Sequence, residues 1–348
     1  MPRALIIGGT GQIGTATARR LLTHGWTVHL TGRDPQHMPA DLTAAGATFT
    51  TAHRDNPAQL ATALGTGADL LVDCICFTAA HARTLQPLAS NATSTVMISS
   101  KAVYVDDHGN HSNSATPPHF TGPVRETQPT LAPRTDIPYN SVEGYGPNKV
   151  AAEHVLLAGN APITILRPSR IHGIGAERPR EWHFVKRALD KRPAILLTQR
   201  GTGTVHPTAA DNIAALIETA AHHPGTRILN SADPDAPSAL DISRTIATHL
   251  GHTRDEILLD STAPAELGRH PWESVHPVIL DTTAAQALGY QPVGDYATTV
   301  VPELDWLTSQ ARGEVGNTVL PGLDDPYFDP LFDYAAEDTY LSASLGAS

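Results

Sequence analysis

The chain has 348 residues, too many for a small disulfide-stapled module, and its length predicts one large domain or two closely joined ones. With 41% hydrophobic and 17% charged residues it can build a sizeable core, which excludes a disordered chain. Its 24 basic residues are outnumbered by 35 acidic ones, and the formal net charge of −11 argues against a nucleic-acid-binding protein.

The first hundred residues alternate between short apolar runs and helical patterns, as βαβ units do. Strands are predicted at residues 3–7, 27–31, 47–51, 70–77 and 94–99. Helices are predicted at residues 12–24, 57–64 and 79–89. This order indicates an α/β fold built on an open, doubly wound parallel sheet.

The regular pattern breaks between residues 105 and 140, where six prolines deny the backbone donors that helices and sheets need. A loop of this length is typical of a lid or of a disordered segment, and we favour a lid. A helix at 142–158, a strand at 163–166 and an α-rich region at 181–310 are predicted next. The aromatic and acidic stretch 326–340 is interpreted as a tail packed on its own domain or on a neighbouring subunit.

The two cysteines, Cys74 and Cys76, are predicted to lie on one face of the fourth strand as buried, reduced thiols. A zinc site is the alternative, but no second Cys or His pair has metal-site spacing, so no metal is expected. The sequence has no run of about 18 apolar residues and no signal-peptide pattern at its N-terminus. We therefore expect a cytoplasmic protein without membrane contacts.

Glycines recur at a spacing of three in the segment from Gly8 to Gly14, between the first predicted strand and the first predicted helix. Such a turn lets the backbone approach a pyrophosphate while the helix N-terminal amides face its charge. This context predicts dinucleotide binding on a Rossmann-type fold. At the end of the second strand, Arg33 favours NADP by its fit to the 2′-phosphate, while Asp34 keeps NAD as the alternative.

Tyr145 and Lys149 lie four residues apart at the start of a predicted helix, hence on one face of it. The ammonium favours the phenolate form, so the pair is suited to moving a proton on a carbinol oxygen. The fifth strand ends in hydroxyl groups, and Ser100 could hydrogen-bond the same oxygen. The sequence therefore predicts a catalytic set of Ser100, Tyr145 and Lys149.

These motifs resemble the extended short-chain dehydrogenase/reductase family, of the NAD-dependent epimerase/dehydratase type. The residues that carry the resemblance are the glycine motif, Ser99-Ser100 with Val103-Tyr104, the Tyr145-to-Lys149 spacing with Glu153, and Leu166-Arg167-Pro168 with Gly173. The resemblance spans about residues 3 to 308. It implies Tyr145 as general acid/base, Lys149 as its tuning partner and ribose ligand, and Ser100 as the catalytic hydroxyl.

The resemblance also implies a set of binding residues. The cofactor contacts are Gly8, Thr10, Gly11, Gln12, Ile13, Gly14, Arg33, Arg54, Cys76, Lys149 and Pro168. The expected substrate contacts are Ser100, Arg170 and His172. His172 is included because it follows the sixth strand, where ligands would lie, and a structural or solvated role is its favoured alternative. The family's adenine-contacting Asp matches His53 or, in a shifted register, Asp55.

Several positions depart from the family pattern. Sugar-nucleotide dehydratases carry an Asp-Glu pair after the catalytic hydroxyl, whereas this chain has Lys101-Ala102, which argues against water elimination. Nucleotide-sugar epimerases usually place an Asn where Arg170 stands, and a diphosphate-binding Arg near Val205 or His206. Both are missing here, although Arg170 or Arg200 could substitute.

The leading hypothesis is therefore an NADP-preferring oxidoreductase that transfers a hydride between nicotinamide and a carbonyl or secondary alcohol of a small polyfunctional molecule. The alternatives are an NAD-dependent sugar or nucleotide-sugar epimerase, and a non-enzymatic dinucleotide-sensing or RNA-binding module. We expect a dinucleotide-binding domain at residues 1–170, joined again by 201–232, a substrate-binding region at 171–200 and 233–310, and a tail at 311–348. The expected partner is a small-molecule substrate, and a homodimer is one expected assembly.

Overall fold

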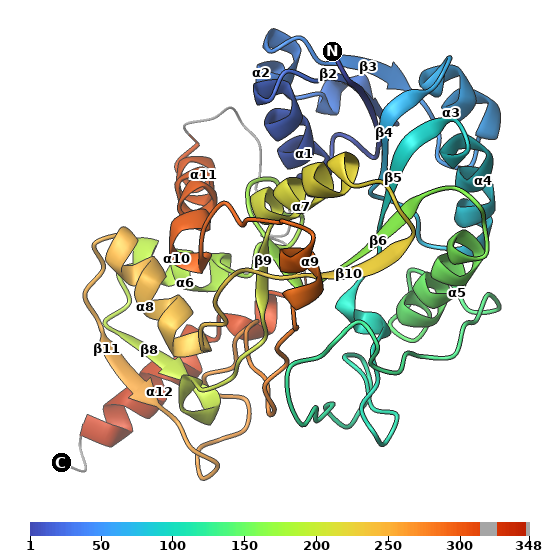
Figure 1. Cartoon of the computed structure of the whole chain (residues 1–348). Helices are drawn as coiled ribbons and strands as arrows, with labels where there is room; N and C mark the ends of the chain where they lie inside the picture. Colours follow the sequence, from blue (N-terminus) through green and yellow to red (C-terminus); the bar gives the residue numbers. More distant parts are fainter. Residues whose placement is uncertain (314–325, 346–348) are drawn as a thin grey trace.

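The computed structural model of the chain describes residues 1–313 and 326–345 (Figure 1). Its main sheet has seven strands in the order β10-β6-β5-β4-β1-β2-β3, and every pair in it is parallel. The strands are β1 (Arg3–Ile7), β2 (Thr27–Gly32), β3 (Thr48–Thr51), β4 (Ala68–Asp73), β5 (Ala92–Ile98), β6 (Ile163–Pro168) and β10 (Arg227–Ser231). The order reverses between β1 and β4, the place where ligands bind in such sheets. The predicted doubly wound Rossmann-type α/β fold is confirmed.

Helices cover both faces of this sheet (Figure 1). One face packs against α1 (Gln12–Thr23), α2 (Ala40–Ala44) and α7 (Ala210–His222), and the other against α3 (Pro57–Leu64), α4 (Ala79–Ala89) and α5 (Tyr145–Leu157). Along β1, Ala4 and Ile6 face the first layer while Leu5 and Ile7 face the second, since successive side chains of a strand alternate. Burial on both faces explains why the strands read as continuous apolar runs.

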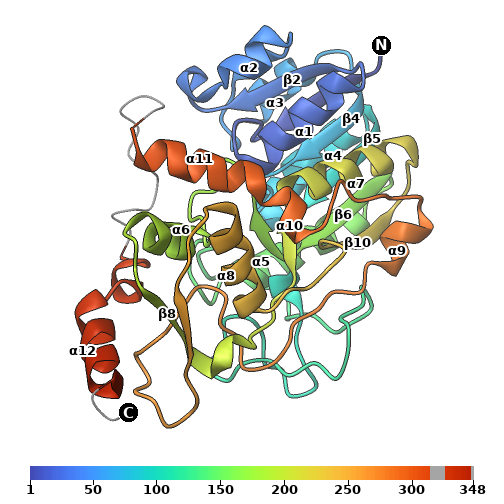
Figure 2. The same ribbon diagram turned by 90° about the vertical axis from the view of Figure 1, so that its left-hand side faces the viewer.

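A smaller α/β region follows in the C-terminal half. Its elements are α6 (Trp182–Leu189), β8 (Ala194–Leu197), α8 (Ala239–His249), β11 (Asp255–Leu258), α10 (Tyr296–Thr299) and α11 (Val301–Ala311). They share a core around Trp182, Phe184, Trp272 and Leu304. The short strands β7 (Arg170–His172) and β9 (Pro207–Ala209) pair beside the main sheet, and α9 (Thr283–Ala287) packs near β10. Figure 2 shows α12 (Tyr334–Leu345) at the outer edge of this region.

The segment between β5 and α5 contains one short 3-10 turn, η2 (Lys101–Val103), and is otherwise irregular. The Asp106 carboxylate organises it by accepting hydrogen bonds from the backbone of His108, Asn110 and His119 at 2.8–2.9 Å. These bonds hold the pKa of Asp106 well below its ordinary value, because they favour the ionised form. The lid function of this segment stays a prediction.

Two sequence-based boundaries were wrong. β4 ends at Asp73 and not at residue 77, because the Asp73 side chain accepts a hydrogen bond from the Ile75 backbone (3.0 Å) and turns the chain. Cys74 and Cys76 therefore lie beyond the strand and not on one of its faces. Both thiols are free, and burial raises the pKa of Cys76 to about 12.

The other wrong boundary is the start of α5, which begins at Tyr145 and not at residue 142. The Ser141 hydroxyl bonds the Gly144 backbone (3.0 Å) and the Pro138 carbonyl (2.8 Å), a local pattern that competes with helix. Tyr145 is thereby the first helical residue.

The tail packs on the protein's own smaller region. Arg187 of α6 donates to Glu337 of α12 at 2.5 Å, and Arg192 lies over the Tyr334 ring, 4.3 Å from its centroid. Among residues 1–313 and 326–345, no helix is long and apolar enough to cross a bilayer. The same residues contain no cluster of three or more potential metal ligands.

Candidate active site

The glycine turn between β1 and α1 is shaped for close approach to a ligand. Gly8 has φ +75°, which favours glycine. A Cβ on Gly14 would lie 2.6 Å from the Gly8 carbonyl oxygen, so its absence lets α1 press against the turn. Gly11 ends the turn as the N-cap of α1, which has no capping side chain and no acid in its first turn. The first amides of α1 therefore remain free of side-chain caps and suit an anionic pyrophosphate.

A cavity of about 480 Å³ opens beside this turn. Thr10 and Gly11 line it from the turn, Arg33 from the end of β2, and Arg54 from the end of β3. These ends lie together because Ile7 of β1 is in register with Thr31 of β2 and Asp73 of β4.

Arg54 forms one wall of this cavity and is only 7% exposed. Its Nη2 lies 2.6 Å from an Asp73 oxygen and 2.8 Å from the His81 carbonyl. Its Nε and Nη1 have no hydrogen-bond partner among the described residues. Buried donors are ordinarily paired, so a polar ligand in the cavity fits this guanidinium, and the residues present fit a dinucleotide.

Two aromatic side chains close one side of the same cavity. Tyr139, from the end of the long irregular segment, stacks on Phe77 with ring centroids 5.2 Å apart. Phe77 also lies 6.4 Å from the Tyr145 ring and beneath the Lys149 ammonium, 4.3 Å from it. The segment before α5 thus reaches the place where the predicted cofactor and catalytic residues meet.

Ser100, Tyr145 and Lys149 gather at the carboxyl end of β5. Lys149 is 1% exposed and donates to the carbonyls of Cys76 (3.0 Å) and Ile98 (2.8 Å), which fixes α5 against the ends of β4 and β5. Ser100 follows β5 and caps η2, where its hydroxyl accepts from the Ala102 backbone (3.1 Å).

Close approach of α5 and η2 depends on Gly146. A Cβ at that position would lie 3.0 Å from the Ala102 carbonyl oxygen and 2.5 Å from the Leu131 side chain. The half-buried Tyr145 precedes this contact in the first turn of α5. The phenol of Tyr145 and the hydroxyl of Ser100 are therefore carried on two elements that touch.

A buried ion pair between β6 and α5 stabilises the elements that carry Ser100 and Tyr145. Arg167 of β6 donates to both oxygens of Glu153 in α5, at 2.5 and 3.0 Å, and Ser99 hydrogen-bonds the same carboxylate. Arg167 also lies over the Tyr104 ring, 4.9 Å from its centroid. Burial alone would lower the pKa of Arg167, but the bonds to Glu153 outweigh it and raise the pKa. Together with Ser99 at the end of β5, this pair therefore links β5, α5 and β6 next to the predicted catalytic residues.

A second cavity, of about 250 Å³, lies between the segment after β5 and the smaller region. Lys101, Ser112 and Arg170 are among its lining residues. Arg170 donates to the Pro271 carbonyl and lies 5.6 Å from the Trp272 ring centroid. The cavity is on the substrate side predicted from the sequence, and Arg170 is in it.

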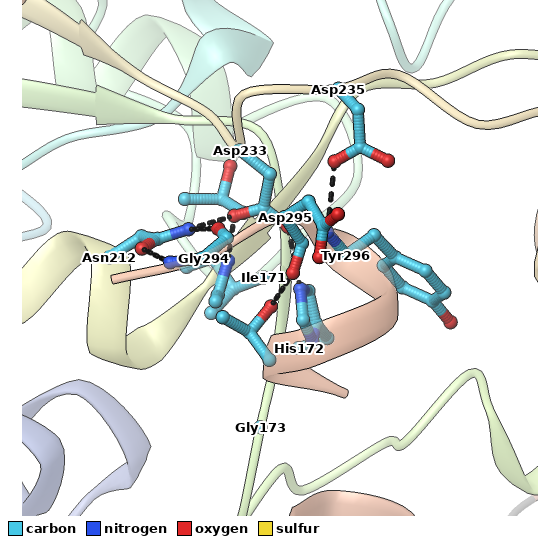
Figure 3. Close-up of polar contacts among 12 residues, drawn as sticks. Ile171, His172, Gly173, Asn212, Asp233, Asp235, Gly294, Asp295 and Tyr296 are labelled. Atoms are coloured by element: carbon cyan, nitrogen blue, oxygen red, sulfur yellow. Dashed lines mark hydrogen bonds and ion pairs between the residues drawn. The ribbon is translucent and has the colours of Figure 1, made fainter. Parts of the chain in front are cut away.

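His172 is placed inside the molecule, 1% exposed, and lines neither cavity. Its Nε2 is 2.8 Å from Asp233, whose other oxygen accepts from Asn212 (2.8 Å) and from the Ala209 backbone (2.7 Å) (Figure 3). The network joins β7, β9 and α7, so the ring has a structural position and the expected substrate contact is not seen.

Four of the predicted cofactor residues, Gln12, Ile13, Cys76 and Pro168, do not line the cavity beside the glycine turn. Gln12 donates to the Gly173 carbonyl (2.9 Å), Ile13 packs on the core, and Cys76 contributes its carbonyl to Lys149. Pro168 ends β6. The cofactor-binding role of these residues stays a prediction.

Sequence reasoning missed two aromatic residues of the cavity, Phe77 and Tyr139, and the buried partner of Arg54, which is Asp73. Asp73 could have been found as a lone acid inside an apolar run, with Arg54 after the preceding strand of the chain. Phe77 and Tyr139 carry no comparable signal, because their stacking depends on how the long segment folds back.

Comparisons with known proteins agree with this geometry. The NAD dependent epimerase/dehydratase family matches residues 4–230. A search of curated proteins found no sequence match. Among solved structures, a UDP-N-acetylglucosamine 4-epimerase from Bacillus cereus has a TM-score of 0.66 and 17% identity, over 88% of this chain and 99% of that one.

Two further solved structures hold NAD. A UDP-glucose-4-epimerase from Stenotrophomonas maltophila, with NAD and formylated UDP-arabinopyranose, has a TM-score of 0.69 and 16% identity, over 90% of this chain and 100% of that one. A dTDP-glucose 4,6-dehydratase from Bacillus anthracis, in complex with NAD, has a TM-score of 0.66 and 14% identity, over 91% of this chain and 99% of that one. At these identities the similarity shows the fold. The family match runs from the first strand of the sheet almost to the end of its last, and the chain therefore belongs to the NAD dependent epimerase/dehydratase family of enzymes.

Proposed function

We propose that the protein is an epimerase of a sugar or nucleotide sugar, which removes a hydride from a secondary alcohol and returns it to the opposite face of the same carbon. The observation that carries the proposal is the gathering of Ser100, Tyr145 and Lys149 at the end of β5, beside the cavity of the glycine turn. Family membership favours this hypothesis over the ketone reductase. Two of the structurally similar proteins are UDP-sugar epimerases.

In this proposal each residue of the set has one task. Tyr145 takes the proton of the substrate hydroxyl and later gives it back, and Ser100 hydrogen-bonds the same oxygen. Lys149, fixed by two carbonyls, places its positive charge near the phenol and the cofactor ribose. A bound nicotinamide would supply hydride acceptance and donation. The α1 amides and Arg54 would hold the phosphates and the adenosine end of the dinucleotide.

Elimination of water is not part of the proposed reaction. The chain has Lys101 and Ala102 after the catalytic hydroxyl, so neither residue there can serve as the carboxylate pair of a sugar-nucleotide dehydratase. A cation and a methyl group cannot replace a carboxylic acid and a carboxylate in protonating and deprotonating the substrate.

A second candidate function is an NADP-dependent oxidoreductase that releases its oxidised or reduced product. Arg33 favours it, because this side chain lines the cofactor cavity at the end of β2, where a 2′-phosphate would lie. Such an oxidoreductase exchanges its cofactor at every turnover, whereas an epimerase retains the dinucleotide.

Proton NMR of a UDP-sugar panel, including UDP-glucose and UDP-N-acetylglucosamine, tests the proposal. We expect the wild-type protein to form a second epimer with no net change of cofactor, and in heavy water to keep the hydrogen on the inverted carbon. Tyr145→Phe should lose this activity. A released keto product with stoichiometric cofactor reduction would favour the second candidate instead.

A further inference from the structure

The cavity predicted to bind the substrate is lined by two basic side chains and one acidic one. Lys101 follows the catalytic Ser100 directly and lines this cavity together with Arg170. Within residues 1–313 and 326–345, neither cation has a carboxylate within 4.0 Å. In the part of the chain that the structure describes, the Lys101 ammonium donates only to the Ser112 hydroxyl, at 3.2 Å.

The groups facing Lys101 from the surrounding elements do not neutralise it. Arg170 comes from β7, and Arg180 precedes α6; both act on Lys101 as like charges. The carboxylate in the lining is Glu273, which is already paired with Arg269 at 2.9 Å. An oxyanion entering this cavity would therefore meet two basic groups that have no carboxylate within 4.0 Å among the described residues.

The protonation of Lys101 reflects this crowding. Burial, with Arg170 and Arg180 as further causes, lowers the pKa of Lys101 to about 7. Burial also lowers the pKa of Arg170 to about 10; Arg180 acts in the same direction, while the carboxylates of Glu273 and Glu181 partly oppose it. A bound anion would reverse this effect, because an opposite charge nearby favours the protonated amine.

We propose that Lys101 and Arg170 together bind an oxyanion, a carboxylate or a phosphate, that the substrate carries close to its reacting carbon. The inference rests on the proposed function, because it treats this cavity as the place of the substrate. Lys101 follows Ser100 directly in the chain, and we infer that one substrate reaches both the Ser100 hydroxyl and this cavity. Lys101 is thus a specificity-determining residue, which selects an acidic sugar over its neutral counterpart.

The chain is suited to a direct test, because it contains only four lysines: Lys101, Lys149, Lys186 and Lys191. NMR of protein with isotope-labelled lysine side chains resolves each amine, and the Lys101→Met variant assigns the signal by its loss. The probes are glucuronate, inorganic phosphate and, as the neutral match, glucose, all at constant ionic strength. Glucuronate and phosphate separate the two sources of the oxyanion.

We expect glucuronate or phosphate to shift the Lys101 signal and raise its titration midpoint by about one pH unit or more, with no response to glucose. The exposed Lys191 serves as the internal control. No shift of Lys101 with either anion, or an equal shift of Lys101 and Lys191, would overturn the inference. The titration itself uses the wild-type protein, and the Lys101→Met variant serves only to assign the signal.

Calorimetric titration of variants separates charge recognition from proton transfer. Lys101→Met should weaken binding of the effective anion about tenfold or more, as expected for the loss of a charged hydrogen bond. Lys101→Arg should keep the affinity within a few fold, and Lys191→Met should leave it unchanged. Equal losses in Lys101→Arg and Lys101→Met would contradict an anion-binding role.

The two proposals fail in different ways. If no sugar changes the nicotinamide but Lys101 still responds to anions, the epimerase proposal fails and the anion site stands. If neutral sugars are epimerised and Lys101 responds to no anion, only the anion site is contradicted.

Discussion

At the scale of single residues, Arg33 is the side chain that we propose discriminates between NADPH and NADH. Arg33→Ala removes the cation that lines the cofactor cavity at the end of β2. We expect NADPH affinity to fall about tenfold or more while NADH affinity changes little, because only NADPH carries the 2′-phosphate. Fluorescence titration with both dinucleotides measures this. Equal losses of affinity for NADPH and NADH would contradict a contact between Arg33 and the 2′-phosphate.

Glu153 joins the elements around the predicted catalytic residues, because its carboxylate binds both Arg167 and Ser99. Glu153→Gln leaves Arg167 buried, 3% exposed, without its charge partner. Breaking such a pair costs about 3–5 kcal/mol of unfolding free energy. Chemical denaturation measures the loss.

The matched control is Glu256→Gln, which breaks a solvent-exposed pair with Arg244 of 2.6 Å. We expect it to cost less than about 1 kcal/mol, since exposed ion pairs contribute little. Similar costs for both variants would show that the Glu153–Arg167 pair gives no special support to the site.

The residues that sequence reasoning found and those it missed differ in one physical respect. Gly14 and Lys149 act through fixed spacing along one turn or one helix, so a linear pattern reveals them. Tyr139 and Phe77 meet only because a long segment without regular structure folds back over the cavity. His172 resembles a ligand contact in sequence but turns inward to Asp233, a choice that depends on three other elements.

At the scale of elements, the glycine turn and α1 form one close contact. Gly14→Ala would gain about 1 kcal/mol of helix propensity. The new Cβ would, however, lie 2.6 Å from the Gly8 carbonyl oxygen and 2.7 Å from the Gly9 Cα, both backbone atoms. Overpacking typically costs about 1–3 kcal/mol, so we expect net destabilisation and weaker dinucleotide binding.

Thermal unfolding and cofactor titration of Gly14→Ala test this contact. Gly122→Ala is the control, because a Cβ at Gly122 meets no atom within 4 Å and its φ lies outside the positive range. That variant should stay within about 0.5 kcal/mol of the wild type. Normal cofactor affinity in Gly14→Ala would contradict the close packing of the turn.

The segment between β5 and α5 is predicted to loosen in acid through Asp106. The pKa of this carboxyl is lowered in the folded protein, so it contributes stability above its unfolded pKa of about 4. That contribution is lost as the pH falls through the folded value. We expect the segment to lose protection from proteolysis by an acid-active protease as the pH falls below about 4.

Asp106→Asn provides the comparison for this prediction. The amide removes the charge, so the segment should already be less protected at neutral pH and should change little on acidification. Equal pH dependence in the wild type and in Asp106→Asn would assign the acid effect to another group.

At the scale of the whole molecule, most of the sheet was predictable and the smaller region was not. The central strands are buried on both faces, so apolar runs mark them in the sequence, whereas the edge strand β10 was not predicted. The smaller region combines short helices with a two-stranded β8–β11 pair, and its core joins residues from Trp182 to Phe328. Such long-range packing produces no periodic pattern of apolar residues in the local sequence. For this reason only an α-rich region could be predicted there.

The central claim is that Tyr145 and Ser100 act on a substrate oxygen while a bound nicotinamide exchanges a hydride. The most direct measurement is the near-ultraviolet absorbance of reduced nicotinamide in dinucleotide-loaded protein mixed with sugars and nucleotide sugars, acidic ones included. We predict a transient absorbance rise in the wild type and none in Tyr145→Phe, with equal dinucleotide affinity in both. A rise of wild-type rate in Tyr145→Phe would contradict the account.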